Sequence, residues 1–244
     1  ITRKGIPQGS PLSALLSNTY LIDFDDYLCK YGLKEGFEYR RYCDDIMIIC
    51  PSEKANGIME VLTREITDKY KLTIQSKKTE VIDFALNEKG IIRAYKREFD
   101  ATSQTFILPE ITQANYKNLQ YLGFEFNGQN IYVRPGSLSR YFRKMKGRIV
   151  RSVMMAYSSN SKSNIINKQQ IFHRYSHLGK RNFLSYAYNA SKKYYTNSKK
   201  EVKEGLDSPS IRRQLAAHFR IINQEIVKTS SQRAKQLGRK KVKV

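Results

Sequence analysis

The sequence predicts an α+β fold, in which a domain with an antiparallel sheet is followed by an all-α basic helical bundle. Three observations support this prediction. The run RYCDDIMIIC, Arg41 to Cys50, has the pattern of a strand, a tight turn and a second strand, which together form a β-hairpin. Helical patterns flank this hairpin and strand patterns follow them, an order typical of α+β domains. From Ser137 onward the spacing of apolar residues is helical.

A first helix is predicted to begin at Ser10, which can cap it, with Pro11 in its first turn. Gly32 is expected to end it. Between these points apolar residues recur at every fourth position and should face the core: Leu12, Leu16, Tyr20, Phe24 and Leu28. The aspartates of this helix would point in different directions, so we interpret them as a solvated surface: Asp23, Asp25 and Asp26.

The hairpin is followed by a second predicted helix, from Pro51 to about Tyr70. Strands are expected near residues 72–74 and 80–84, which would complete the antiparallel sheet. Residues 87–111 show no clear pattern, and we interpret them as a family-specific insertion on the surface.

Asn127 and Gly128 predict a hairpin turn between strands at 121–126 and 131–134. The dipeptide Pro135-Gly136 should close the sheet, so the predicted domains are residues 1–136 and 137–244. The second domain should contain four helices and then a mobile basic tail, at residues 138–156, 165–178, 181–196, 211–228 and 233–244.

The net charge of +22 is carried by the second domain. From Arg140 onward there are 26 Lys and Arg against 4 Asp and Glu, whereas the preceding residues hold 18 of each kind. So basic a segment could bind a polyanion, lie on a membrane surface or form a disordered arm. Aromatic residues interleaved with the cations favour folded helices that bind nucleic acid.

Other classes find little support in the sequence. No apolar run approaches the length of a membrane span, and no secretory signal is present. The three cysteines, Cys29, Cys43 and Cys50, have no metal-ligand spacing. We therefore expect a cytoplasmic protein in a reducing compartment, without a membrane partner.

The predicted hairpin turn carries two carboxylates, Asp44 and Asp45. Adjacent aspartates alone are an ordinary turn pair. Apolar residues on both sides, however, should bury the hairpin, and a buried rim tolerates two like charges only when a cation neutralises them. Because Mg²⁺ prefers carboxylate oxygens, the sequence predicts a site for a divalent metal here.

Four short segments resemble motifs of the reverse transcriptase family. Tyr42-Cys43-Asp44-Asp45 resembles the Tyr-X-Asp-Asp signature, motif C, and the segment 5–10 (GIPQGS) resembles the Pro-Gln-Gly signature, motif B, that precedes it. Residues 72–79 resemble motif D, and residues 121–126 resemble the primer-grip strand of motif E. Two signatures in the right order make the resemblance specific. It covers about the first half of the chain and is nearest to the bacterial group II intron, retron and phage-defence enzymes.

The resemblance implies a polymerase-type palm followed by a basic, helical, thumb-like bundle. It implies an RNA-directed DNA polymerase, a nucleotidyltransferase that uses two Mg²⁺ ions, with Mn²⁺ as an alternative. Asp44 would be a direct metal ligand, and Asp45 a second ligand or an electrostatic support. Lys78 would protonate the leaving pyrophosphate, although its neighbour Lys77 could be the lysine meant.

Further site residues follow from the same resemblance. Gln8, Gly9, Tyr42 and Cys43 would contact the nucleotide, the templating base or the primer terminus, with a small packed side chain as an equal alternative for Cys43. Leu122 and Gly123 would form the primer grip. The first basic helix would contact nucleic acid through four cations, of which the last three are expected to share one side: Arg140, Arg143, Lys144 and Arg148.

In this family the fingers and motif A, with another metal-binding aspartate, precede motif B. Residues 1–244 contain neither, so we expect the same polypeptide or a separate chain to supply them. Residues 1–244 alone should accordingly bind nucleic acid without polymerising. The expected partners are an RNA template, a DNA primer and product, dNTPs and, for some members, a structured non-coding RNA.

A retron or phage-defence enzyme is favoured, because no appended nuclease is evident. The alternatives are a group II intron maturase and reverse transcriptase, and a non-catalytic nucleic-acid-binding module with a polymerase-like palm. An RNA-dependent RNA polymerase is less favoured, because such enzymes usually carry Gly before the two aspartates.

Overall fold

The computed structural model describes residues 11–75, 78–103, 105–107, 115–158 and 165–238. The chain divides into two compact units, Ile1–Lys117 and Asn118–Val244. Both helices and antiparallel strands are present, which confirms the predicted α+β class. Within the described residues no helix is both long and apolar enough to cross a membrane.

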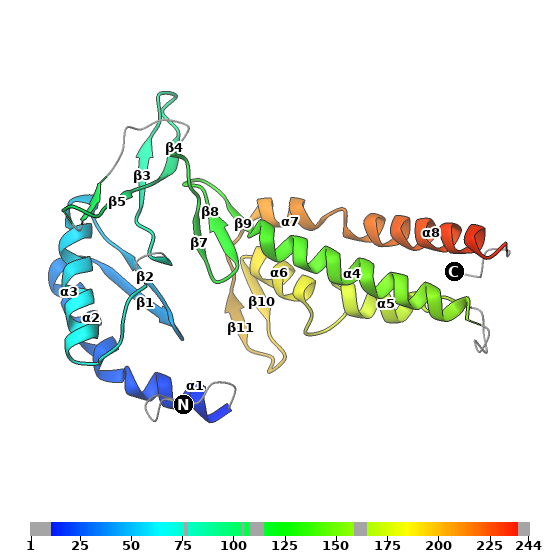
Figure 1. Ribbon diagram of the computed structural model, residues 1–244, viewed down its shortest axis with the longest axis horizontal. Coiled ribbons are helices and arrows are strands. Elements are labelled where there is room, and N and C mark those ends of the chain that lie inside the picture. The colour runs from blue at the N-terminus through cyan, green and yellow to red at the C-terminus, as the bar shows by residue number, and fades with distance from the viewer. Residues whose placement is uncertain (1–10, 76–77, 104, 108–114, 159–164, 239–244) are drawn as a thin grey trace. The chain divides into compact units, whose positions relative to one another are not determined.

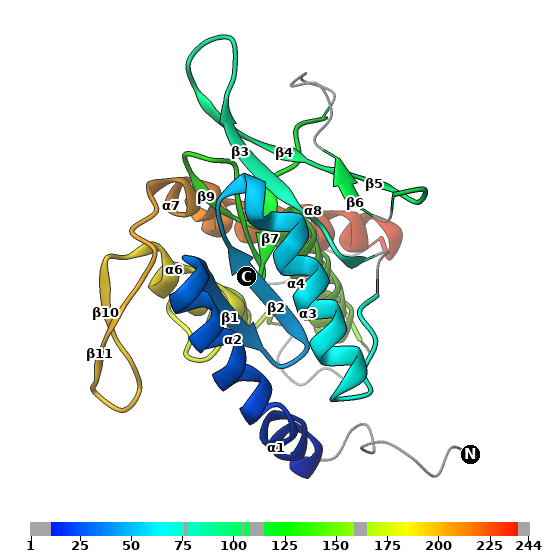
Figure 2. The same cartoon turned by 90° about the vertical axis from the view of Figure 1, so that its left-hand side faces the viewer.

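In the first unit two helices cover one face of a β-hairpin (Figures 1 and 2). The elements in chain order are α1 (Pro11–Tyr20), α2 (Ile22–Glu35), β1 (Glu38–Tyr42), β2 (Asp45–Ile49), a 3₁₀ turn (Ser52–Lys54) and α3 (Ala55–Asp68). Helices α2 and α3 place their apolar stripes against Tyr39 and Ile48, which pair across the two strands. The buried stripes are formed by Phe24, Leu28, Ile58, Leu62 and Ile66.

The first predicted helix is two helices. The chain breaks at Leu21, and the apolar residues before the break are exposed and not part of the core: Leu12, Leu16 and Tyr20. Gly32 does not end α2, which continues to Glu35 and is capped by Gly36 at φ 76°. Gly32 is needed for packing, because a Cβ atom there would lie 2.5 Å from the carbonyl oxygen of Phe37. The proposed cap, Ser10, lies outside the described residues.

The rest of the first unit forms two further antiparallel hairpins. Their strands are β3 (Ile82–Leu86), β4 (Ile92–Lys96), β5 (Glu98–Asp100) and β6 (Thr105–Ile107). The segment interpreted as a surface insertion thus contains regular strands in its described part. The strand expected over 72–74 does not form, whereas the one expected at 80–84 is β3, displaced by two residues.

A buried ion pair holds these hairpins to the 3₁₀ turn that precedes α3. The Arg97 Nε donates to Asp83 Oδ2 at 2.6 Å, and Arg97 Nη2 donates to the Ser52 carbonyl at 2.7 Å. The Ser52 hydroxyl donates to Asp83 Oδ1 at 2.5 Å. Because the charged groups are paired and hydrogen-bonded, their burial is tolerated.

The second unit is helical with two small sheets (Figure 1). Strands β7 (Leu119–Tyr121), β8 (Phe124–Phe126) and β9 (Ile131–Val133) form an antiparallel sheet. The hairpin predicted at Asn127-Gly128 is present between β8 and β9. The following elements are α4 (Pro135–Ala156), α5 (Lys168–Tyr175), α6 (Phe183–Ser191), β10 (Tyr194–Thr196), β11 (Val202–Glu204), α7 (Pro209–Leu215) and α8 (His218–Gln236).

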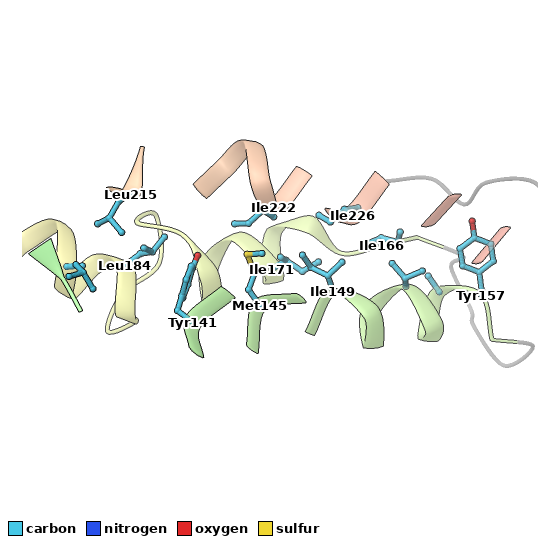
Figure 3. Close-up of a cluster of buried hydrophobic side chains, with 14 of the residues drawn as sticks. Tyr141, Met145, Ile149, Tyr157, Ile166, Ile171, Leu184, Leu215, Ile222 and Ile226 are labelled. Carbon is cyan, nitrogen blue, oxygen red and sulfur yellow. The ribbon is translucent and has the colours of Figure 1, made fainter. Parts of the chain in front are cut away.

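Helices α4 and α8 run side by side along one apolar core, which Figure 3 shows. The buried face of α4 recurs every fourth residue, as Tyr141, Met145, Ile149 and Val153. Ile222 and Ile226 of α8 complete the core from the opposite side. This spacing fixes the opposite face of α4, which carries most of its cations, toward solvent.

The division between the units falls between Lys117 and Asn118, and not at Pro135-Gly136 where the sequence indicated a boundary. The reason lies in α7. The Gln214 side chain accepts from the Val133 amide at 2.8 Å and donates to the Val133 carbonyl at 3.3 Å. Strand β9 is thereby joined to the helices that follow it.

Two helix predictions for the second unit need correction. The helix expected over 181–196 ends at Ser191, and the chain then forms the β10–β11 hairpin. The helix expected over 211–228 is α7 and α8, and α8 continues to Gln236. Arg233 therefore belongs to a helix in which Ala234 is buried, and not to a tail. Residues 239–244 lie outside the described residues.

Candidate active site

The two predicted carboxylates lie at the end of the β1–β2 hairpin. Tyr42 pairs with Asp45 across the strands, so Cys43 and Asp44 form a two-residue turn and Asp45 is the first residue of β2. Asp45 and Tyr42 share the face of the hairpin opposite to Tyr39 and Ile48, because successive side chains of a strand alternate. The pair thus lies on the face that α2 and α3 leave open.

The tip of the hairpin is not buried, which corrects one step of the sequence-based argument. Asp44, Asp45 and Cys43 are exposed, and the Tyr42 side chain is 61% exposed. Exposed carboxylates are solvated and do not require a neighbouring cation for the fold to form. Support for a metal here must therefore come from the chemistry of the family and not from burial.

A third aspartate, Asp25 of α2, takes part in the support of this turn. Its Oδ1 accepts from the Tyr39 hydroxyl and from Arg41 Nε, both at 2.7 Å, and its Oδ2 accepts from Arg41 Nη2 at 2.5 Å. Burial alone would raise the pKa of Asp25, but the hydrogen bonds from Arg41 and Tyr39 and the Arg41 charge outweigh it and lower that pKa. The same hydrogen bonds raise the pKa of Arg41. The sequence-based interpretation of Asp25 as a solvated surface residue was wrong.

The structure gives less support to the roles predicted for the other site residues of the first unit. Lys78 is exposed, and its backbone amide donates to the Gln75 carbonyl at 2.9 Å. Gln8, Gly9 and Lys77 lie outside the described residues. Their assignments remain predictions.

Leu122 and Gly123 form a turn and not part of a strand. Tyr121 of β7 pairs with Phe124 of β8, and both turn residues have positive φ, 47° for Leu122 and 88° for Gly123. The segment that resembles the primer grip, residues 121–126, therefore contains the β7–β8 turn and strand β8 of the second unit. A leucine in this conformation is strained, which is typical of positions under a functional or packing constraint.

Four cations of α4 form a line along the helix that is exposed at Arg140, Lys144 and Arg151. It is half-buried at Arg148, whose Nη2 donates to Gln170 Oε1 at 3.0 Å. Arg140, Lys144 and Arg148 recur at four-residue spacing, and Arg151 continues the line. Arg143 is also exposed and lies about 60° around the helix from Arg140, but it lies about 100° from Lys144 and about 140° from Arg148, so it does not share one side with those two as expected. Within the described part of the chain, none of these five cations lies within ion-pairing distance of a carboxylate.

A family model described as reverse transcriptase (RNA-dependent DNA polymerase) matches residues 1–126, more than half of the 244. The chain belongs to the reverse transcriptase family. No curated protein matches it. The matched region includes the β1–β2 hairpin and the Leu122-Gly123 turn of this reverse transcriptase, whereas α4 to α8 lie beyond it.

The family implies divalent metal ions, and the carboxylates of this reverse transcriptase fit one. In the residues that the structure describes, no group of three or more His, Cys, Asp or Glu side chains gathers into a metal site. Asp44 and Asp45 provide two adjacent, exposed carboxylates. Mg²⁺ commonly binds one or two carboxylates and takes its remaining ligands from water and substrate phosphates. The pair therefore suits Mg²⁺ that arrives with a nucleotide.

The turn of this reverse transcriptase should be most stable with glycine at position 43. Cys43 has a φ of 55°, in the left-handed region where a Cβ atom costs about 1 kcal/mol. We expect Cys43→Gly to exceed Cys43→Ala in free energy of unfolding by about 1 kcal/mol. Chemical denaturation of both variants measures the difference.

Cys29 provides the matched control, because it is exposed within the regular helix α2. There the order should reverse, with Cys29→Ala more stable than Cys29→Gly by about 1 kcal/mol. The same order at both positions would show that Cys43 is not strained in solution.

Proposed function

We propose that this protein catalyses RNA-templated DNA synthesis, with Asp44 as a direct ligand of the catalytic Mg²⁺ ions. The observation that carries the proposal is the exposed Asp44-Asp45 pair at the tip of the β1–β2 hairpin, inside the region that matches the family. Asp45 provides a second ligand or electrostatic support. When bound, two Mg²⁺ ions activate the primer 3′-hydroxyl and stabilise the charge that develops on the leaving pyrophosphate.

The chain's own residues position the primer and the incoming nucleotide and protonate the leaving pyrophosphate. Tyr42, on the open face of the hairpin beside Asp45, and Cys43 contact the primer terminus. Gln8 and Gly9 contact the templating base or the incoming nucleotide. Lys78, which is exposed and free to turn toward a ligand, donates a proton to the pyrophosphate. Each of these roles rests on the match of the residue to a motif of the family.

We assign the second unit to the template and primer. Its β7–β8 turn, Leu122-Gly123, acts as the primer grip, and its helices act as the thumb. The thumb assignment is supported by the line of Arg140, Lys144 and Arg148, because a row of cations at the helix surface can follow a phosphate backbone. On this view the palm-like chemistry and the duplex-binding surface belong to different compact units.

Primer extension tests the proposal. The complete protein, with an RNA template, an annealed DNA primer, labelled dNTPs and Mg²⁺, should extend the primer, and chelation of the metal should stop extension. Binding without extension would favour the non-catalytic module instead. Extension with NTPs in preference to dNTPs would indicate an RNA polymerase.

A retron or phage-defence role is our preferred biological setting, with a group II intron enzyme as the alternative. The basic surface of the second unit is compatible with a structured RNA partner in either case. Sequencing the RNA and DNA that co-purify with the protein separates them, because a retron yields DNA copied from one short non-coding RNA.

A further inference from the structure

One side chain, that of Arg41, connects the helices of the first unit to the backbone of the Cys43-Asp44 turn. Arg41 uses Nε and Nη2 to bind the Asp25 carboxylate. Its third nitrogen, Nη1, donates to the Cys43 carbonyl at 2.8 Å and to Asn18 Oδ1 at 3.1 Å. The whole guanidinium is therefore engaged, with Asp25 and Asn18 on one side and the turn on the other.

The bonded carbonyl belongs to the peptide that joins Cys43 to Asp44. Because a peptide unit is planar, holding its oxygen also fixes the direction in which the chain enters Asp44. Cys43 is in the left-handed region at φ 55°, a conformation that persists only when surrounding contacts enforce it. The hydrogen bond from Arg41 is such a contact.

The side chains of Asp25 and Arg41 are much less exposed than those of an ordinary surface ion pair. The Arg41 side chain is 8% exposed and that of Asp25 is 32% exposed. By comparison, the neighbouring pairs Arg40 with Glu38 and Lys30 with Asp26 have side chains 60–74% exposed. Removing the Asp25 charge would leave a desolvated guanidinium without its charged partner, and the guanidinium would then move toward water and release the Cys43 carbonyl.

We propose that Asp25 and Arg41 are positioning residues, which hold the Cys43-Asp44 turn so that the Asp44 carboxylate is presented for nucleotidyl transfer. The inference rests on the proposed function for its catalytic consequence, but the restraint on the turn is independent of it. Lysine cannot replace Arg41, since a single ammonium cannot reproduce the planar fork that binds Asp25 while a third nitrogen reaches the turn.

The kinetic test uses Arg41→Gln, Arg41→Lys and Asp25→Asn in the complete protein. Because small misplacements of reacting groups are costly, kcat for dNTP incorporation should fall about a hundredfold in each, while the KM for dNTP changes much less. Arg41→Lys should regain most of the thermal stability lost in Arg41→Gln without regaining kcat. If stability and kcat fall and recover together, the pair is merely structural and the inference is overturned.

Matched controls come from the adjacent residues. Arg40→Gln removes the neighbouring arginine of β1, and Asp26→Asn removes the neighbouring aspartate of α2, from pairs that are largely exposed. Both should leave kcat within about twofold of the wild type, because exposed ion pairs contribute little. A loss in the controls as large as in the test variants would contradict a specific role for Asp25 and Arg41.

Amide hydrogen exchange of residues 41–46 separates this inference from the proposed function. Exchange in the turn should accelerate about tenfold or more in the three test variants and remain unchanged in the two controls. If the wild-type protein does not polymerise and exchange still accelerates, the proposed function fails but the restraint on the turn stands. Unchanged exchange in Arg41→Gln overturns the inference whatever the activity.

Discussion

Asp44→Ala is expected to abolish nucleotide incorporation, with a loss of at least about a thousandfold in rate. A carboxylate ligand of a catalytic metal contributes several kcal/mol of charge stabilisation, and each 1.36 kcal/mol changes the rate about tenfold. Affinity for the primer and template should stay the same or rise, because a negative charge disappears. Primer extension with labelled dNTP and Mg²⁺ measures the first effect, and equilibrium binding in the absence of dNTP measures the second.

Asp26→Ala is the matched control for this experiment. It removes another exposed aspartate of the same unit, and the ion pair that Asp26 makes within the described residues is with Lys30 at the surface. Its incorporation rate should match the wild type. If Asp44→Ala also incorporates near the wild-type rate, the assignment of Asp44 as a metal ligand is refuted.

The second large effect is a steep fall of nucleic-acid affinity with salt. Cations that meet phosphates release counterions, so affinity falls with salt whatever the base sequence. Engaging about six phosphates gives a slope of log affinity on log salt near −5, which is a loss of roughly a thousandfold between 50 and 200 mM. Fluorescence anisotropy with two unrelated duplex sequences measures the slope and its dependence on sequence.

Reversing the α4 line to glutamate at Arg140, Lys144 and Arg148 tests where this affinity arises. If all three meet phosphates, the slope should fall to about −2.7, which is a loss of roughly fortyfold over the same range. A triple reversal at exposed lysines of the first unit, Lys30, Lys34 and Lys89, alters the net charge equally and should leave the slope nearly unchanged. Equal effects of the two triples would mean that total charge, and not the α4 line, controls binding.

A strong preference for one nucleic-acid sequence, with an unchanged slope of log affinity on log salt, would indicate a different kind of ligand. The second unit would then recognise a particular structured RNA and not a generic duplex. An affinity that hardly responds to salt would remove the thumb assignment and leave the basic helices as a surface for another kind of partner.

The hairpin that carries Asp44 could be predicted because its signal is local. A strand pattern on each side of a short turn predicts the hairpin, which the structure contains. The turn itself lies one residue earlier than predicted, because Tyr42 pairs with Asp45, so that Cys43 and Asp44 form the turn and Asp45 begins β2. The partnership of Asp25 with Arg41 could not be predicted in this way. The two residues are 16 positions apart, and they meet only because α2 packs its Phe24 and Leu28 stripe against β1. The sequence did contain one signal for this pair. An aspartate lies beside the apolar stripe of the helix, and an arginine occupies an inward position of the next strand.

In the second unit the sequence-based prediction failed for another reason. The many charged residues hid the spacing of the buried ones. The basic end of α8 was expected to be a tail, yet Ile226, Ser230 and Ala234 continue the four-residue spacing of its buried face. Small residues contribute little to a hydrophobic pattern, so the core position of Ser230 is visible only when the Tyr157 hydroxyl is seen to donate to its carbonyl at 3.1 Å. The β10–β11 hairpin was likewise missed, because its lysines and tyrosines are compatible with a helix as well as with a strand.

The attachment of β9 to α7 decides how the polypeptide can be dissected. A cut at residue 126, where the match to the family ends, would separate β8 from β9, and a cut at 136 would leave Gln214 without the backbone of Val133. The junction between Lys117 and Asn118 keeps each sheet whole. Genetic fusions, domain exchanges between homologues and separately expressed halves should therefore be joined or divided at that peptide bond, although it lies inside the segment that sequence comparison treats as one domain.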